Sequence, residues 1–296
     1  MQAGCHLKQP TAHPGDVKLA QSIKNLLDFA SQKLVESPSA RFDAELLLAH
    51  TLESTRSFLY ANPEFELPGV RAETFKKLIK QRAHGTPIAY LIESSEFWSL
   101  PLRVTPDVLI PRPETELLVE TALEILPVEA DWRVADLGTG SGAIALAIAS
   151  ERKKLEVHAA DISPAAIRVA RENARQLKLK NIHFHYGSWT QPLSGKFQLV
   201  VSNPPYIDAG DPHLKQGDLR FEPRGALTPG NEGTSAIRDI SRLVHPILVD
   251  GGWLMLEHGW DQGTASRDIL VAAGYTNVMT LKDLAGLDRV TIGEKA

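Results

Sequence analysis

An asparagine and two prolines end an apolar segment in the stretch Phe197-Gln-Leu-Val-Val-Ser-Asn-Pro-Pro-Tyr-Ile. Proline has no N–H and a fixed φ, so the chain is held rigid immediately after the strand that the apolar run predicts. The side-chain oxygen of Asn203 and the carbonyl of Pro204 can therefore face one direction, and Tyr206 flanks them. Two acceptors in fixed positions suit the two hydrogens of a planar –NH₂ group.

Such a pair of acceptors can also promote a reaction at nitrogen. A conjugated nitrogen is a poor nucleophile, and acceptors on both hydrogens stabilise the positive charge that develops as nitrogen bonds to carbon. Holding that nitrogen in line with an electrophilic methyl group supplies proximity, and the π face of Tyr206 can cover the cation. We predict catalytic roles for Asn203, Pro204 and Tyr206, and substrate binding by Asn203, Pro204, Pro205 and Tyr206. For this segment alone, a Pro-Pro strand terminator is the alternative.

A second chemical signal is the glycine-rich loop Asp136-Leu-Gly-Thr-Gly-Ser-Gly, which ends one expected strand and opens a helix. Glycine lets the backbone turn sharply and approach a ligand without a Cβ in the way. The carboxylate of Asp161 ends the next expected strand, where it can accept both hydroxyls of a ribose. A nucleoside-type ligand should therefore lie over this edge of the sheet.

The spacing of the glycines distinguishes between nucleoside ligands. Dinucleotide enzymes show G-x-G-x-x-G, whereas this chain has G-x-G-x-G after an acidic residue. That form resembles the S-adenosylmethionine loop of Rossmann-like methyltransferases, and the resemblance places Asp136 near the methionyl end of the cofactor. The residues predicted to bind this cofactor are Gly138, Thr139, Gly140, Ser141, Gly142 and Asp161. A tight structural turn is the alternative for the loop alone.

The glycine loop, Asp161 and Asn203–Tyr206 together resemble the amino-methyltransferases that act on planar nitrogens. Three further segments narrow the match: Ile110-Pro-Arg-Pro-Glu-Thr-Glu, residues 206–227, and Leu256-Glu-His-Gly-Trp-Asp-Gln-Gly. With the helical N-terminal region, they make nearly the whole chain from about residue 16 similar to the release factor glutamine methyltransferases.

The resemblance implies methylation of the side-chain amide nitrogen, N5, of the glutamine in the Gly-Gly-Gln motif of peptide chain release factors. The implied methyl donor is S-adenosyl-L-methionine, and the implied partner is the release factor. The resemblance also places Trp189 near the adenine and gives Asn203 a contact to the cofactor. Ser188 is expected to bind the cofactor as well, because its hydroxyl can hydrogen-bond an edge of the adenine. In the family an Asp often precedes this Trp, whereas Ser188 carries no charge.

Two other functions are compatible with these residues. A nucleic-acid methyltransferase acting on adenine or cytosine would flip a base into the same acceptor pair, and a non-catalytic adaptor bound to the ribosome or a factor would keep only the fold. The net charge of −4 argues against the first, because nucleic-acid binding favours a basic surface. The intact segment Asn203–Tyr206 argues against the second.

The cysteine count and the length of the apolar runs limit which compartments and metal sites are compatible with the sequence. The single cysteine, Cys5, excludes an intrachain disulfide and a Cys-rich zinc site, and we expect no metal. The longest apolar run, Ala143–Ala149, is too short to span a bilayer, and the N-terminus lacks the apolar core of a signal peptide. We therefore expect a cytoplasmic monomer without direct contact to membrane or nucleic acid.

The elements that position these residues are expected to form two domains. Residues 1–15 are predicted to be a flexible tail, 16–86 a helical substrate-docking domain, 87–112 a hairpin linker and 113–296 the methyltransferase domain. Asp16 should cap the first helix, and no strand is predicted before His84. In the linker, Glu96–Ser99 and Leu102–Thr105 are expected to pair.

Strands and helices alternate after Glu114, which predicts a parallel, doubly wound α/β sheet. The resemblance implies that this fold is of the Rossmann-like class I methyltransferase type. Expected strands are Arg133–Leu137, Glu156–Ala160, Ile182–Tyr186, Phe197–Ser202, Gly252–Glu257, Asn277–Leu281 and Arg289–Gly293. Expected helices are Glu114–Leu126, Gly142–Ser150, Pro164–Leu177, Thr234–Val244 and Gln262–Ala273. A short loop around Gly286 joins the last two strands, so they should be antiparallel.

Some charged residues have two interpretations. Glu114 and Glu116 can line the cofactor pocket or can suit the dipole at the start of a helix. His258 is expected to support its loop, since the chemistry above needs no base. The predicted helix 68–84 carries basic residues that form either a docking face or a solvated one: Arg71, Lys76, Lys77, Lys80 and Arg82.

Overall fold

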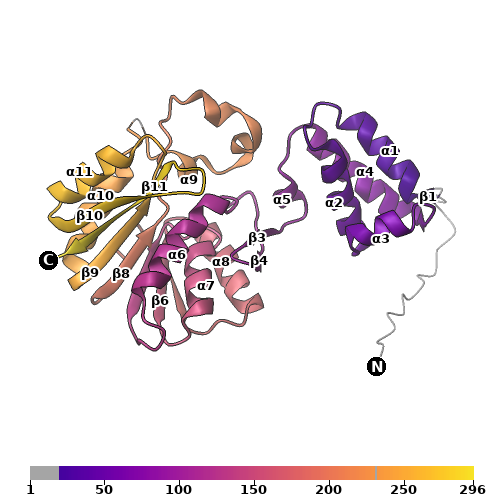
Figure 1. The fold of residues 1–296 in the computed structure, drawn as a ribbon. Helices are drawn as coiled ribbons and strands as arrows, with labels where there is room; N and C mark the ends of the chain where they lie inside the picture. The colour runs from indigo at the N-terminus through magenta and orange to yellow at the C-terminus, as the bar shows by residue number, and fades with distance from the viewer. Residues whose placement is uncertain (1–19, 231) are drawn as a thin grey trace. The chain divides into compact units, whose positions relative to one another are not determined.

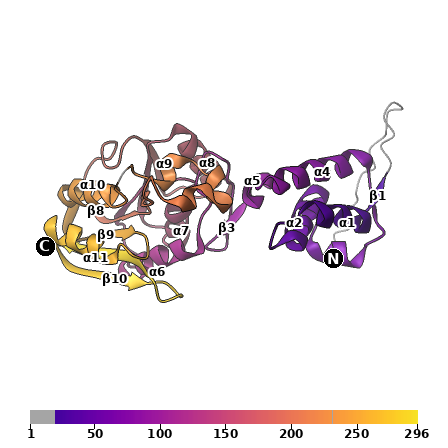
Figure 2. The ribbon, with the colours of Figure 1, turned by 90° about the horizontal axis from the view of Figure 1, so that it is seen from above.

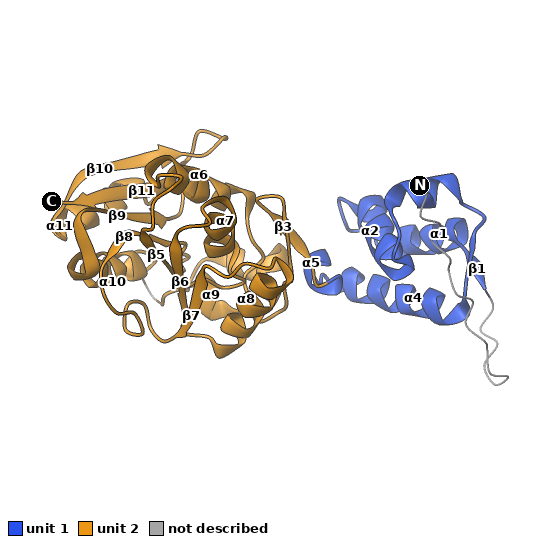
Figure 3. Ribbon diagram, turned by 90° about the horizontal axis from the view of Figure 1, so that it is seen from below, with its two compact units in different colours: residues 1–92 blue, residues 93–296 orange. Residues whose placement is uncertain are grey.

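The computed structural model describes residues 20–230 and 232–296, and Figure 1 draws the chain as a ribbon coloured along the sequence. Two compact units are present, Met1–Ile92 and Glu93–Ala296 (Figure 3). Each unit has its own hydrophobic core. Within the described residues, no helix is both long enough and apolar enough to cross a membrane.

Unit 1 is a bundle of short helices. They are α1 Ile23–Lys33, α2 Ala40–Leu52, α3 Arg56–Ala61, α4 Gly69–Ala83 and α5 Ile88–Leu91. Leu26, Leu47 and Phe75 come from three of these helices and are fully buried in one core. The start of α1 is set by Ser22, whose hydroxyl accepts a backbone N–H of the first turn. The expected cap, Asp16, lies outside the described residues.

Unit 1 also contains a strand pair that its sequence does not predict. β1 Gln21–Ser22 pairs antiparallel with β2 Glu66–Leu67, so the expectation of no strand before His84 is wrong. A two-residue pair is too short to show an alternation of apolar and polar side chains. The unit extends to Ile92, beyond the expected residue 86, because α5 packs against the same core.

A seven-stranded sheet organises unit 2 (Figure 2). Its strands are β5 Arg133–Leu137, β6 Glu156–Asp161, β7 Ile182–Tyr186, β8 Phe197–Ser202, β9 Leu248–Glu257, β10 Tyr275–Lys282 and β11 Asp288–Lys295. Their order is β10-β11-β9-β8-β5-β6-β7. The five strands β5 to β9 are parallel, and β11 is antiparallel to both β9 and β10. The predicted α/β fold and the antiparallel last pair are confirmed.

Helices cover both faces of this sheet (Figure 1). One face packs against α6 Glu116–Ile125, α7 Ala143–Glu151 and α8 Pro164–Gln176, and the other against α10 Ser235–Val244 and α11 Gly263–Ala272. Short elements between them are the 3₁₀ turn η1 Pro113–Thr115 before α6, the 3₁₀ turns Pro212–Lys215, Gly217–Phe221 and His245–Ile247, and α9 Arg224–Leu227. The sequence analysis did not predict the turns after β8 or α9.

A hairpin opens unit 2. β3 Ser95–Phe97 pairs with β4 Leu100–Leu102, so the second strand lies earlier than the expected Leu102–Thr105. The turn residues Trp98 and Ser99 have positive φ values of 52° and 56°, a conformation that asparagine and glycine usually supply. The buried side chains of the hairpin join the core of unit 2, so it belongs to that unit.

Candidate functional site

Four strand ends meet at one edge of the sheet. β5 lies between β6 and β8, β9 follows β8, and all four strands run parallel. Their carboxyl ends carry the glycine-rich loop, Asp161, Asn203 and Glu257. This edge is where ligands bind in open parallel sheets, so the topology brings the predicted residues together.

A cavity of about 270 Å³ opens at this edge. The predicted residues that line it are Gly138, Gly140, Asp161, Ser188, Trp189, Asn203 and Pro205. Ile162, which was not predicted from the sequence, also lines the cavity and is 70% exposed. Its position directly after a strand-end carboxylate is a usable signal. Val108, Leu109, Pro223 and Ala226 also line the cavity from distant loops. No role was predicted for them, although Pro223 and Ala226 belong to the segment 206–227 that carries the family resemblance.

The glycines of the loop differ in what they do. Gly140 has a φ of +56°, and a Cβ added there would meet nothing within 4 Å, so a ligand can approach its backbone. Gly142 has a φ of +87°, and a Cβ there would meet the side chain of Leu146 at 2.9 Å. Gly142 therefore serves the packing of α7. Thr139, Ser141 and Gly142 lie outside the lining of the cavity.

Two carboxylates, Asp136 and Asp161, lie next to the glycine-rich loop. Asp136 is buried, Thr139 donates to its Oδ2 at 2.7 Å, and its Oδ1 has no hydrogen-bond partner among the described residues. Burial raises the pKa of Asp136 to about 7. The oxygens of Asp161 accept from the backbone N–H groups of Gly140 at 2.9 Å and Ser163 at 2.8 Å, and burial raises its pKa. Each carboxylate oxygen of Asp161 keeps a further lone pair for a ligand.

Trp189 lies against the glycine loop. A Cβ built on Gly138 would make an ordinary contact of 3.6 Å with the indole ring, so it is the φ of +74°, not lack of space, that favours glycine there. The backbone of Trp189 has a φ of +43°, which is uncommon for a bulky side chain and is found at ligand sites. Ser188 lines the cavity beside it.

A second, smaller cavity of about 70 Å³ is lined by Pro204 and Tyr206. It shares Leu109, Asn203 and Ala226 with the larger one. The residues Asn203–Tyr206, here called the acceptor segment, are therefore divided between the two cavities, and Asn203 is the predicted site residue that lines both.

Hydrogen bonds hold the acceptor segment in place. The Nδ2 of Asn203 donates to the hydroxyl of Thr115 at 3.2 Å. The hydroxyl of Tyr206 donates to Glu257 at 3.3 Å, and the carbonyl of Tyr206 accepts from Gln262 at 2.9 Å. Burial, with the charge of Glu257 nearby, raises the pKa of Tyr206. The tyrosine is thus a neutral, anchored ring.

Two of the segments that carry the family resemblance meet at the smaller cavity. Arg112, from the Ile110-Pro-Arg-Pro stretch, lines this cavity and pairs with the buried Glu222. Glu222 also accepts from the backbone N–H of Ile110 at 3.3 Å. Burial raises the pKa of Glu222, and Arg112 opposes that rise. This ion pair joins the loop before α6 to the loop after β8.

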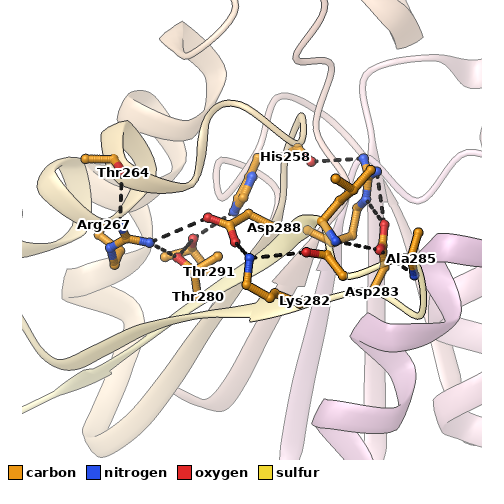
Figure 4. Close-up of polar contacts among 12 residues, drawn as sticks. His258, Thr264, Arg267, Thr280, Lys282, Asp283, Ala285, Asp288 and Thr291 are labelled. Atoms are coloured by element: carbon orange, nitrogen blue, oxygen red, sulfur yellow. Dashed lines mark hydrogen bonds and ion pairs between the residues drawn. The ribbon is translucent and has the colours of Figure 1, made fainter.

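The other polar candidates have structural contacts. Glu114 and Glu116 line neither cavity, and Glu116 accepts from the backbone N–H of Trp98 at 2.7 Å. His258 is fully buried, and its Nδ1 donates to the carbonyl of Gly259 at 2.8 Å. Its Nε2 accepts from Thr291, also at 2.8 Å (Figure 4). Both ring nitrogens therefore support the loop after β9.

The basic residues of α4 are partly engaged within unit 1. Arg82 pairs with the buried Asp43 at 2.8 Å, and Arg71 donates to the carbonyl of Leu52. Lys76 pairs with a glutamate one turn away on the same helix. These contacts favour a structural role for three of the five basic residues. Among the described residues, no group of His, Cys, Asp and Glu side chains could hold a metal ion.

Comparisons with known proteins agree with this arrangement. A model of the PrmC N-terminal domain matches residues 25–92, and one of the methyltransferase small domain matches residues 114–218. The release factor glutamine methyltransferase of Vibrio cholerae is 47% identical over 93% of this chain and 98% of its own length. The chain belongs to the release factor glutamine methyltransferase family. The family member from Escherichia coli is 48% identical over 89% of this chain and 95% of its own.

A solved structure supports the fold independently. The methyltransferase of Pyrococcus furiosus has a TM-score of 0.51 at 16% identity, covering 67% of this chain and 89% of that one. The predicted class I methyltransferase fold and the family resemblance are therefore both confirmed.

Proposed function

We propose that this protein transfers a methyl group from S-adenosyl-L-methionine to the side-chain amide nitrogen, N5, of the glutamine in the Gly-Gly-Gln motif of peptide chain release factors. The observation that carries this proposal is the position of Asn203 in the lining of both cavities. One residue can then contact a cofactor on one side and an amide on the other. The names of the family members support the release factor as the protein partner.

The larger cavity has the groups that this cofactor requires. The open space beside Gly140, which lines the cavity, lets a ligand approach the backbone of the loop. Asp161 would hold the ribose hydroxyls, and Trp189 would lie beside the adenine with Ser188. When bound, the cofactor supplies an electrophilic methyl group on a sulfonium centre.

The smaller cavity would hold the glutamine side chain. The Oδ1 of Asn203 and the carbonyl of Pro204 accept the two amide hydrogens, which orients the nitrogen and stabilises the positive charge that develops on it. The hydroxyl of Tyr206 is engaged by Glu257, so its ring is the surface offered to that charge. No base is needed beforehand, because the methylated nitrogen becomes acidic and loses its proton afterwards.

Mass spectrometry tests this proposal directly. The protein is incubated with S-adenosyl-L-methionine and a purified release factor, and the tryptic peptides of the release factor are analysed. We expect one added methyl group on the glutamine of the Gly-Gly-Gln loop. A release factor with glutamate in place of that glutamine should stay unmodified, because the acid has no –NH₂ group. Methylation of nucleic acid with an unmodified loop glutamine would contradict the proposal.

A further inference from the structure

The smaller cavity offers acceptors to the –NH₂ group of a substrate amide, but the amide also has an acceptor of its own. A glutamine side chain carries two N–H donors and one carbonyl oxygen. Asn203 and Pro204 provide oxygens for the two donors in the proposed arrangement. The carbonyl oxygen then needs a donor in the same cavity, because a polar group that is buried without a partner weakens binding.

Among the described residues that line this cavity, Arg112, Asn203 and Tyr206 have side chains that can donate a hydrogen bond. The –NH₂ group of Asn203 is engaged by Thr115 at 3.2 Å, and the hydroxyl of Tyr206 is engaged by Glu257 at 3.3 Å. The remaining lining side chains are apolar: Leu109, Pro204, Ile207, Leu219, Ala226 and Leu227. Arg112 is therefore the lining side chain whose donors are available to a ligand.

The guanidinium of Arg112 has more donors than the protein uses. A guanidinium carries five N–H groups in a planar fork. Arg112 directs its Nη2 to an oxygen of Glu222, and its side chain stays 30% exposed. Within the described part of the chain, its Nε and Nη1 have no hydrogen-bond partner. These nitrogens can donate into the cavity that the side chain lines.

Glu222 fixes the place of this guanidinium. The glutamate follows the 3₁₀ turn Gly217–Phe221, and its side chain is fully buried. Its Oε1 accepts from the backbone N–H of Ile110 at 3.3 Å, while its Oε2 pairs with Arg112. One carboxylate thus holds both the backbone and the side chain of a short segment. Moving Arg112 away from the cavity would leave a buried carboxylate without its counter-charge, which is costly.

Glu222 also compensates the charge of Arg112. Positive charge develops on the amide nitrogen during methyl transfer, so a lone cation beside the amide would oppose the reaction. Although burial raises the pKa of Glu222, Arg112 and the N–H of Ile110 oppose that rise and favour the ionised carboxylate. The ion pair therefore offers hydrogen-bond donors to the substrate without a net charge.

We propose that Arg112 is a substrate-binding residue, which donates to the carbonyl oxygen of the reacting glutamine side chain, and that Glu222 is its positioning residue. This inference rests on the proposed function, because it names the group that binds the other polar end of the same amide. Acceptors for the –NH₂ group and a donor for the oxygen select one of the two flipped orientations of the amide. In the other orientation, the amide oxygen would oppose the oxygen of Asn203 and the –NH₂ group would oppose the guanidinium.

The first test measures kcat and KM on a purified release factor. Glu222→Gln leaves the cation uncompensated, and we expect kcat to fall about tenfold with little change in KM. Combining it with Arg112→Met removes the cation and the donor together. In this double variant kcat should recover toward the parent value, while KM should rise about tenfold, the effect of one lost hydrogen bond. The Kd for S-adenosyl-L-methionine should stay at the parent value in both.

Arg224→Met is the matched control. Arg224 is an exposed cation on α9, two residues after Glu222, and it lines neither cavity. This variant should keep the parent kcat and KM. A rise in KM as large as that of the double variant would show a general effect of positive charge on this loop and would contradict a specific role for Arg112.

A second measurement identifies the atom that Arg112 contacts. A release factor with methionine in place of the loop glutamine has a side chain of similar length without a carbonyl, and it serves as a competitive inhibitor. Its Ki should be equal for the parent and the double variant, because the inhibitor has no side-chain oxygen for Arg112 to bind. A rise in Ki that matches the rise in KM would mean that Arg112 contacts the main chain of the substrate, and the inference would be wrong.

The outcomes separate this inference from the proposed function. If the parent methylates the loop glutamine and the double variant keeps the parent KM, Arg112 does not bind the amide and the function stands. If kcat of the double variant stays as low as that of Glu222→Gln, the charge compensation is wrong. If Glu222→Gln shows no thermal unfolding transition, KM and Ki of the double variant, which leaves no buried charge unpaired, decide alone. A parent protein that leaves the glutamine unmodified overturns the function itself.

Discussion

Asn203 lines both cavities, and the nitrogen and oxygen of its side-chain amide have different roles. The nitrogen is engaged by Thr115 inside the protein, which leaves the oxygen for a ligand. Five other residues with an expected cofactor contact line the larger cavity: Gly138, Gly140, Asp161, Ser188 and Trp189. Turnover and cofactor binding can therefore be separated by substitutions at single residues.

Asn203→Ala removes one of the two proposed acceptors. Turnover should fall by about 10²–10³, by analogy with the loss of one oxyanion-hole partner. The Kd for S-adenosyl-L-methionine should change much less. Asn203→Asp is the matched variant, because it keeps an acceptor oxygen at nearly the same place and should retain partial activity. Methylation at the parent rate by Asn203→Ala would show that the residue does not act on the substrate amide.

Asp161→Ala tests the cofactor side of the site. The carboxylate both holds the N–H of Gly140 and offers lone pairs to a ribose, so its loss should weaken cofactor binding by about 1–3 kcal/mol. Isothermal titration calorimetry measures this change. Asp268→Ala, at an exposed position on α11, is the control and should bind as the parent does. An unchanged affinity for Asp161→Ala would remove this residue from the cofactor site.

At the scale of elements, the sequence predicts what has a local signature. The predicted bounds of β5, β7 and β8 match the observed ones. β5 and β8 are short, mostly buried apolar runs, as expected for parallel strands covered on both faces, whereas β7 is a half-exposed edge strand. The two-residue pair of β1 and β2 and the short turns after β8 have no such signature. The hairpin was expected, but its register was not, because Trp98 and Ser99 take a backbone conformation that their side chains do not favour.

The same limit applies to the site. Asp161 and Asn203 are visible in the sequence because each follows an apolar strand. Glu257 also ends an apolar strand, but its contact with Tyr206 and that of Thr115 with Asn203 cannot be predicted, because these partners are 51 and 88 residues away along the chain. A hydrogen bond between distant segments depends on the strand order of the sheet, and one sequence without its fold does not specify that order.

The strands β6 and β7 carry a pair of stacked histidines whose titration should be visible in stability. The rings of His158 and His185 are 5.1 Å apart, and their facing nitrogens are separated by 3.0 Å. Burial lowers the pKa of both, and Arg133 opposes their protonation. The folded state therefore favours the neutral rings. The stabilisation is complete above the ordinary histidine pKa of about 6.5 and is lost as the pH falls below it.

Urea unfolding between pH 8 and 5 measures this effect. We expect the free energy of unfolding of the parent to fall more steeply below pH 6.5 than that of His185→Gln, which cannot titrate. His50→Gln, at an exposed position on α2, is the control and should retain the parent slope. Equal slopes for the parent and His185→Gln would show that the stacked pair does not couple protonation to unfolding.

At the scale of the whole molecule, each of the two units has its own hydrophobic core. The core of unit 1 contains residues from Ile23 to Ile79, and that of unit 2 contains residues from Phe97 to Ile292. The boundary between units lies at Ile92 and Glu93. Both cavities of the candidate site are lined by unit 2 residues. Unit 1 is therefore expected to act on the protein substrate rather than on the chemistry.

A fragment of residues 93–296 tests this division. It keeps β3 and β4, whose Phe97 and Leu102 are buried in the core, and it should show one cooperative thermal transition and bind S-adenosyl-L-methionine with the parent affinity. A fragment of residues 111–296 lacks these side chains and should unfold at a lower temperature. On a full-length release factor, we expect kcat/KM of the 93–296 fragment to fall tenfold or more, equivalent to about 1.4 kcal/mol of lost docking. On a short Gly-Gly-Gln peptide, the fragment and the parent should be equal, because a peptide offers no surface beyond the reacting loop. Equal kcat/KM on the full-length release factor would show that unit 1 does not dock the substrate.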